Sequence, residues 1–373
     1  MDEAIKIVCA AHYHQCLWLS STEKHPRLRV TFSTTGNFGD DTLPVVIFCG
    51  PMFGSRWLVQ DFNHFICASR VRVICVDRPS MGGSTPVDIS QRIPVWLETV
   101  PVLLQKLNIK HVHLLSHSAG TMYLLNTLYH HRDILYPHYP YAALLAPWVH
   151  NEHSNVTLMN IVSKIPNGMI NNFSQLQKFV VSRVLPVTDF SGGALSWSGG
   201  ALSAVTRLFQ TAPAANVEVD DNAEVTPQEK YGVPHEVAQH LSKLQMKYCV
   251  TESWAAGDED AILCLKKAGP GHWGICEDYP EYVRLLVELE QSRRNSIPDA
   301  PKLKMRVYLA ESDMMIGKEG ATYFKQCWAR SGVSDTIDFQ SHELPKTNHE
   351  TIIVDTKRGG LKPVFEEISH RMQ

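Results

Sequence analysis

The sequence predicts an α/β fold with a mostly parallel central sheet, helices on both of its faces, and a mainly helical insertion. Apolar, β-leaning runs alternate with segments whose apolar residues recur every three or four positions, which is the pattern of parallel strands joined by crossover helices. This alternation stops near residue 150 and returns near residue 300. One strand also passes directly into a helix through a serine-rich bend, which marks a candidate site.

The first part of the chain supplies five predicted strands and two predicted helices. Leu28–Ser33 alternates between apolar and polar residues as a half-buried strand does, and the run that reaches Leu115 also alternates. Residues 43–49 form a continuous apolar run, as expected where both faces of a sheet are covered. The predicted strands are 28–33, 43–49, 71–77, 111–115 and 141–146, and the predicted helices are 96–107 and 119–135.

Residues 151–300 lack this alternation and carry helical patterns at about 234–248 and 279–294. We interpret them as a helical lid or cap inserted into one core, and an independent second domain is the alternative. The core resumes in 301–373 with strands at 305–310 and 336–340, a helix over 321–329, and a closing helix that contains Phe365 and Ile368. The predicted division is therefore a core of 1–150 and 301–373 around an insertion of 151–300.

Composition excludes several classes of protein. The chain has 373 residues, a net charge of −3 and no block of Lys or Arg that would attract nucleic acid. No apolar run approaches the roughly 20 residues that a membrane span requires, and the start shows no secretory signal. The nine scattered cysteines form no C-x-x-C pair, so we expect a cytoplasmic protein without a disulfide framework. The histidines at 12, 14, 130, 131 and 138 have no shared helical spacing with carboxylates, and we expect no metal or cofactor.

The bend lies in the stretch 111–125, where Ser116, Ser118 and Gly120 form an S-x-S-x-G pattern. A serine on a sharp strand-to-helix turn exposes its Oγ, while the N-terminal amides of the helix point at whatever lies above it. Small residues are needed on both sides because the bend brings backbone against backbone. The alternative is a serine-rich turn in which Ser116 or Ser118 caps the helix.

Residues suited to acyl transfer follow three of the predicted strands. A nucleophilic serine needs a base that takes its proton, an acid that orients the base, and amides aimed at the developing oxyanion. Ser118, Asp313 and His349 each come just after a strand, where loops at the carboxyl ends of a parallel sheet carry functional groups. Their order along the chain is Ser, Asp, His.

With these residues the chain resembles the α/β-hydrolases of the serine type that carry a lid after the sixth strand. The resemblance covers roughly 28–150 and 300–373, and it implies that Ser118 is the nucleophile, His349 the base and Asp313 the acid. It also implies an oxyanion hole made by the backbone N–H groups of Ala119 and Met52. The loop at Met52 lacks the usual His-Gly pair, and Ser116 replaces the first glycine of the bend.

Alternative residues exist for two of these roles. His117 and His342 are other candidates for the base, although a neighbour on a tight turn points away and His342 falls within or at the end of the last strand. Glu152 is the alternative acid, since some members of the family place the acid after the preceding strand. The turn at 77–84 resembles the family's glycine-rich turn, which shapes the floor of the pocket without taking part in the chemistry.

The sequence therefore predicts a serine hydrolase that acts on a small-molecule carboxylic ester or a related acyl compound through an acyl-enzyme. The alternatives are a non-catalytic small-molecule binder, or a carbon–carbon hydrolase or acyltransferase with the same triad. Because position 118 is a serine, the dehalogenases and epoxide hydrolases of this fold, which use an aspartate nucleophile, are disfavoured. Aromatic residues of the insertion are the candidates for substrate contact: Phe173, Phe179, Trp197, Trp254 and Trp273.

Overall fold

The computed structural model describes residues 1–156, 159–160, 163–164, 167, 226–252, 255–297 and 299–371. Its strands are β1 (Gln15–Leu19), β2 (Leu28–Thr34), β3 (Val45–Cys49), β4 (Arg72–Val76), β5 (His113–His117), β6 (Tyr141–Leu145), β7 (Leu303–Ser312) and β8 (Ile337–Asn348). Its α-helices are α1 (Asp2–Val8), α2 (Leu58–Ala68), α3 (Arg92–Lys106), α4 (Gly120–His130), α5 (Asn151–Ser154), α10 (Pro227–Tyr231), α11 (His235–Thr251), α12 (Ala255–Cys264), α13 (Tyr279–Ser296), α14 (Gly317–Trp328), α15 (Val333–Thr336), α16 (Thr351–Val354) and α17 (Leu361–Arg371).

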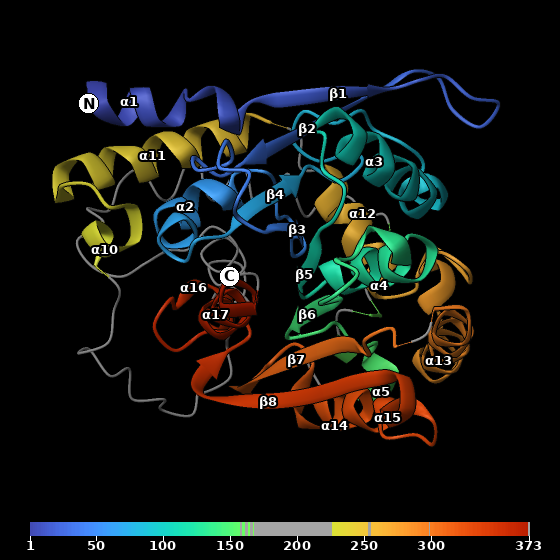
Figure 1. Cartoon of the computed structure of the whole chain (residues 1–373). Helices are drawn as coiled ribbons and strands as arrows, with labels where there is room; N and C mark the ends of the chain where they lie inside the picture. Colours follow the sequence, from blue (N-terminus) through green and yellow to red (C-terminus); the bar gives the residue numbers. More distant parts are fainter. Residues whose placement is uncertain are drawn as a thin grey trace.

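The eight strands form one sheet in the order β1-β2-β4-β3-β5-β6-β7-β8. The strands from β4 to β8 pair in parallel, and only β1 and β2 run antiparallel to their neighbours. In Figure 1 the sheet runs from β1 at the top to β8 at the bottom, with α2, α16 and α17 on one side and α3, α4 and α13 on the other. The predicted fold class is confirmed.

Alternating residues of the central strands pack on opposite faces of the sheet. In β3, Val45 and Ile47 join the apolar cluster that includes α3 and α4, whereas Val46 and Phe48 join the cluster of α2 and α17. A strand covered on both faces has no polar side to show, which explains the continuous apolar runs in the sequence. The parallel strands thus carry their carboxyl ends, and the loops that follow them, to one edge of the sheet.

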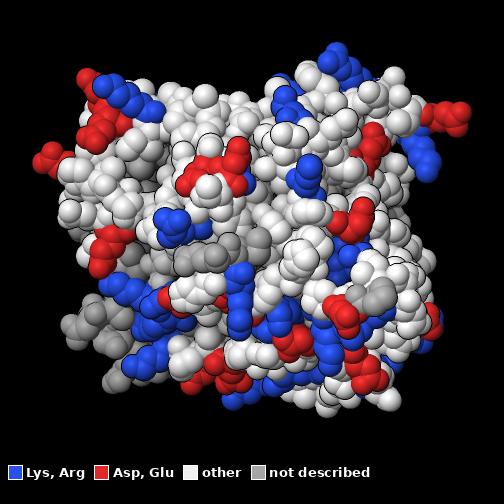
Figure 2. Space-filling view, in the orientation of Figure 1, with Lys and Arg blue, Asp and Glu red and all other residues white. Residues whose placement is uncertain are grey.

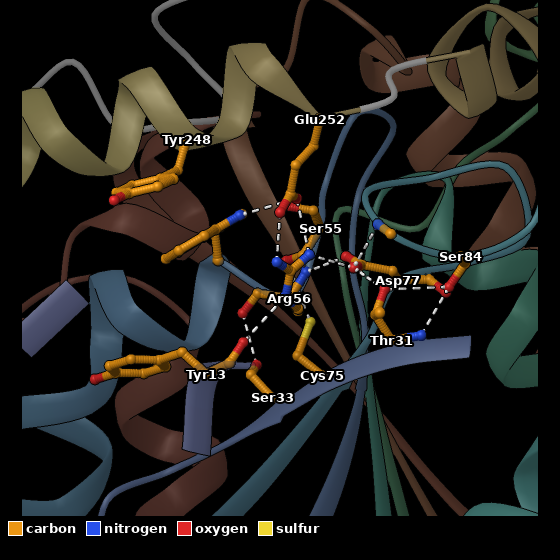
Figure 3. A network of polar contacts seen from close by, with 12 residues as sticks. Tyr13, Thr31, Ser33, Ser55, Arg56, Cys75, Asp77, Ser84, Tyr248 and Glu252 are labelled. Atoms are coloured by element: carbon orange, nitrogen blue, oxygen red, sulfur yellow. Dashed lines mark hydrogen bonds and ion pairs between the residues drawn. The ribbon is translucent and has the colours of Figure 1, made fainter. Parts of the chain in front are cut away.

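The chain between β6 and β7 contains the part that we call the inserted segment (residues 151–300). Its described residues form helices joined by turns and include no strand. Figure 3 shows one of its attachments to the core, in which Arg56 lies between Asp77 at the end of β4 and Glu252 at the end of α11. The Arg56 guanidinium lies 2.7 Å from the Asp77 carboxylate and 2.5 Å from that of Glu252. The two carboxylates outweigh the effect of burial and raise the pKa of Arg56 above its ordinary value.

The structure also contains elements that the sequence pattern did not reveal. The helix α2 and the edge strand β1 were not predicted, and β5 continues two residues further than expected, to His117. The helix after the bend is shorter than predicted because the chain leaves it at His131 and turns back, so that Leu135 forms a parallel bridge with Val112.

None of the described helices is long and apolar enough to cross a membrane. On the face of the molecule shown in Figure 2, basic and acidic side chains are interspersed rather than gathered by sign.

One buried histidine gives the fold a dependence on pH. The side chain of His113 in β5 is fully buried and stacks on Tyr136, and neither of its ring nitrogens has a hydrogen-bond partner among the described residues. Burial lowers the pKa of His113 from 6.5 to about 3. Between pH 6.5 and pH 3, His113 therefore binds a proton in the unfolded chain but not in the folded chain.

We predict that the free energy of unfolding decreases as the pH falls below 6.5, and that His113→Phe makes this decrease shallower by up to about 1.4 kcal/mol per pH unit. Chemical denaturation between pH 7.5 and 5 measures the slope. The exposed residue His342 provides the control, because His342→Gln should leave the slope unchanged. Equal slopes for wild type and His113→Phe would contradict the prediction.

Candidate active site

Ser118 lies on the bend between β5 and α4, with its backbone in the left-handed region at a φ of 51°. The N–H of Ser118 donates to the carbonyl of Leu145 in the neighbouring strand (3.1 Å), and the Ser118 carbonyl accepts from Thr121 in the first turn of α4. At Gly120 a Cβ atom would lie 2.0 Å from the carbonyl oxygen of Cys49. Only glycine fits there, and the bend does bring backbone against backbone.

The structure brings Ser118, His349 and Asp313 into one hydrogen-bonded chain. The Oγ of Ser118 lies 2.9 Å from Nε2 of His349, and Nδ1 of His349 lies 2.7 Å from Oδ2 of Asp313. Ser118 is 4% exposed and His349 is 5% exposed. Three residues that are up to 231 positions apart in sequence thus meet at the carboxyl edge of the sheet.

The carboxylate of Asp313 is held by the turn that leads into α14. Its Oδ1 accepts from the backbone N–H groups of Met315 (2.8 Å) and Ile316 (3.0 Å), which leaves Oδ2 for His349. Burial opposes ionisation, but His349 and these two N–H groups outweigh it and hold the pKa of Asp313 below its ordinary value of 3.8. Asp313 is therefore ionised at neutral pH.

Two histidines at the site have opposite pKa shifts. Burial acts to lower the pKa of His349, but the Asp313 carboxylate outweighs it and raises that pKa above 6.5. Burial lowers the pKa of His117 to about 3, so His117 is neutral. The Nε2–H of His117 donates to the backbone carbonyl of His349 (2.8 Å), and His117 therefore holds the loop that carries His349.

The structure places the alternative residues away from the Ser118 hydroxyl. His342 lies on the exposed part of β8 and stacks on Tyr308. The side chain of Glu152 is 73% exposed and pairs with His150 at 3.7 Å. Nδ1 of His349 is bonded to Asp313 and not to Glu152.

Two backbone N–H groups near the bend have no hydrogen-bond acceptor among the described residues. Ala119 directly precedes the first residue of α4, and Met52 lies in the loop that follows β3. Among the described residues, no carbonyl or side chain accepts from the N–H of Ala119 or from that of Met52. Since Gly120 packs on the carbonyls of Cys49 and Gly50, the two loops that carry these amides are in direct contact.

A family model described as "Alpha/beta hydrolase family" matches residues 45–349. The chain belongs to the α/β hydrolase family. The match spans β3 to His349, and so includes all three residues of the hydrogen-bonded chain. The protein is therefore a hydrolase, although no curated protein matches the sequence.

Solved structures with the same fold include proteins of low sequence identity to this α/β hydrolase. One belongs to the carboxylesterases of the thaumarchaeon Nitrososphaera gargenis, with 11% identity, a TM-score of 0.54, and 95% of this chain and 98% of that chain covered. Another is epoxide hydrolase I of potato (Solanum tuberosum), with 12% identity, a TM-score of 0.54, and 96% and 98% covered. At such identities the likeness establishes the shared fold.

The sequence did not reveal a further arginine at this site of the hydrolase. Arg78, in the turn expected only to shape the pocket floor, is 1% exposed and donates to the carbonyls of Gly50 and Pro51, next to Met52. The Asp-Arg-Pro sequence directly after a strand marks Arg78 as a residue at the carboxyl edge of the sheet, but the neighbouring sequence does not indicate which groups the arginine binds.

Other predicted features lie elsewhere. Trp273 is buried within the inserted segment, where its Nε1–H donates to the carbonyl of Leu263, while Phe173, Phe179, Trp197 and Trp254 lie outside the described residues. Among the described residues, no group of three or more His, Cys, Asp or Glu side chains could hold a metal ion.

The close approach at Gly120 predicts a strong effect of adding one methyl group. Gly120→Ala would place Cβ 2.0 Å from the Cys49 carbonyl oxygen, so β3 and α4 must separate. We expect a loss of several kcal/mol of stability, measured by denaturant unfolding. Gly39→Ala is the control because a Cβ there meets no atom within 4 Å. Equal stability of the two variants would contradict the geometry.

Proposed function

We propose that this hydrolase cleaves small-molecule carboxylic esters through an acyl-enzyme on Ser118. In the proposed reaction, Oγ of Ser118 attacks the ester carbonyl while Nε2 of His349 takes its proton, and Asp313 orients and stabilises the imidazolium. The N–H groups of Ala119 and Met52 bind the oxyanion of the tetrahedral intermediate. His349 then protonates the leaving alcohol, and water activated by His349 releases the acid.

The observation that carries the proposal is the hydrogen-bonded chain from Ser118 through His349 to Asp313. This order of contacts supplies a base within reach of the hydroxyl proton and a carboxylate on the far side of that base. A serine at the bend argues against epoxide opening, which in this fold uses an aspartate nucleophile. A pure binder would have no need for the ionised, doubly amide-bonded Asp313 behind the histidine.

We also propose that the inserted segment, residues 151–300, is the lid of this site, between core parts 1–150 and 301–373. Two contacts of α12 support this role. Gly257 packs so closely on the Phe53 ring that a Cβ would lie 1.9 Å from it, and the Ala256 N–H bonds the Ser80 carbonyl at 3.3 Å. Phe53 and Ser80 belong to the loops after β3 and β4, so α12 lies against two loops at the carboxyl edge of the sheet. A lid in this position restricts water and limits the size of the substrate.

A covalent probe tests the nucleophile. We expect a serine-directed fluorophosphonate to label Ser118 alone, and Ser118→Ala to abolish both labelling and hydrolysis of p-nitrophenyl acetate, with a loss in turnover on the order of 10⁴-fold or more. Mass spectrometry of the labelled peptide identifies the site. Ser116→Ala, two residues away in β5, is the control and should keep its label. Labelling that persists in Ser118→Ala would refute the assignment.

The acid is tested by the pH dependence of turnover. Because His349 must be neutral to act as a base and its pKa lies above 6.5, kcat/KM should rise with pH through that pKa and be lost below it. Asp313→Asn removes the charge that raises this pKa, so the inflection should move to lower pH while turnover falls by about 10³- to 10⁴-fold. Glu152→Gln should change neither. A large effect of Glu152→Gln with a mild effect of Asp313→Asn would move the acid to Glu152.

A further inference from the structure

The loop that carries Met52 forms a tight turn. The Pro51 carbonyl accepts from the N–H of Gly54 at 2.8 Å, and Phe53 between them has a φ of 61°, which is unfavourable for a bulky side chain. Such a turn persists only where its surroundings hold it. The peptide unit that joins Pro51 to Met52 contains both that carbonyl and the N–H proposed to bind the oxyanion.

Arg78 fixes the direction of this peptide unit. Its Nη2 donates to the Pro51 carbonyl at 2.6 Å, and its Nη1 donates to the carbonyl of Gly50. In a trans peptide the N–H points opposite to the C=O, and no cis peptide occurs among the described residues. When Arg78 and Gly54 hold the Pro51 carbonyl on one side, they direct the Met52 N–H to the other side.

The partner that holds Arg78 comes from the inserted segment. Oδ2 of Asp260 in α12 lies 2.6 Å from Nη2 of Arg78, and both side chains are buried, at 0% and 1% exposure. The other oxygen of Asp260 pairs with Arg92 at 2.8 Å. One turn earlier on α12, Gly257 packs on the Phe53 ring. The same helix therefore touches the turn directly and also through Arg78.

We propose that Arg78 and Asp260 are positioning residues for the oxyanion hole. Asp260 of the inserted segment holds the guanidinium, and the guanidinium orients the Pro51–Met52 peptide so that the Met52 N–H meets the developing oxyanion. The inserted segment thus contributes to the chemical step as well as covering the site. This inference rests on the function proposed above.

The test measures turnover and the preference for oxygen over sulfur at the substrate carbonyl. A thionoester differs from its ester only by C=S in place of C=O, and sulfur is a poorer hydrogen-bond acceptor, so a well-formed oxyanion hole favours the ester. In Arg78→Gln we expect kcat for the ester to fall by about 10- to 100-fold, less than the loss of a whole oxyanion donor. KM should change by less than about twofold, and the ester-to-thionoester ratio should fall as well. Arg78→Lys should partly restore both kcat for the ester and the ester-to-thionoester ratio.

Asp260→Asn should change kcat and the ratio in the same direction, and it should add nothing in the Arg78→Gln background because it acts through Arg78. Glu290→Gln is the matched control. Glu290 is also a fully buried carboxylate of the inserted segment paired with a core arginine, Arg132, and that pair is not part of the proposed site. It should lower stability without changing kcat per labelled site or the ratio.

The outcomes separate this inference from the proposed function. No labelling of wild-type Ser118 overturns the function itself, and with it this inference. Labelled wild type with Arg78→Gln and Asp260→Asn behaving like Glu290→Gln overturns only the positioning role. If Arg78→Gln does not fold, Arg78→Lys and Asp260→Asn decide the question by the same two measurements.

Discussion

The steric contact between the start of α4 and the end of β3 is the constraint on which the site depends. Because Gly120 leaves no space for a side chain against the Cys49 carbonyl, the chain must bend sharply just before it, and Ser118 takes a positive φ at that bend. The same contact joins the first turn of α4 to the loop that carries Met52. Backbone geometry at this corner of the sheet thus fixes the positions of the Ser118 hydroxyl and of the Ala119 and Met52 N–H groups. His349 and Asp313 reach the same corner from the loops after β8 and β7.

The polar groups around this corner are arranged so that each has one defined role. Asp313 uses one oxygen for two amides and the other for His349, which fixes the plane of the carboxylate. His117 stays neutral because it is buried, and its Nε2–H donates to the backbone carbonyl of His349. The pKa values of these neighbouring histidines are therefore shifted in opposite directions, because a carboxylate outweighs burial at His349 whereas burial dominates at His117.

Most of the fold could be predicted from sequence because its central strands are buried on both faces and show as apolar runs. The strand β1 escaped notice because it is a short edge strand in which only Leu17 and Leu19 are buried, and β8 extends beyond its predicted end because its outer part is exposed and polar. Ser118, Asp313 and His349 could be proposed because each follows a recognisable strand. The bond between Arg78 and Asp260 could not, because these residues are 182 positions apart and no local pattern links them.

Buried or partly buried ion pairs join the inserted segment to the core at several separate points: Arg56 with Glu252, Arg78 with Asp260, Arg132 with Glu290, and Asp61 with Lys230. A buried charge that loses its partner destabilises the folded state by several kcal/mol. We therefore expect the core and the inserted segment each to be unstable without the other. The core strands β6 and β7 are adjacent in the sheet, yet more than 150 residues must be accommodated before β7 can add beside β6. Addition of β7 and β8 to the sheet consequently depends on folding of the inserted segment. The molecule should then unfold in one cooperative transition, and the inserted segment should not unfold before the core.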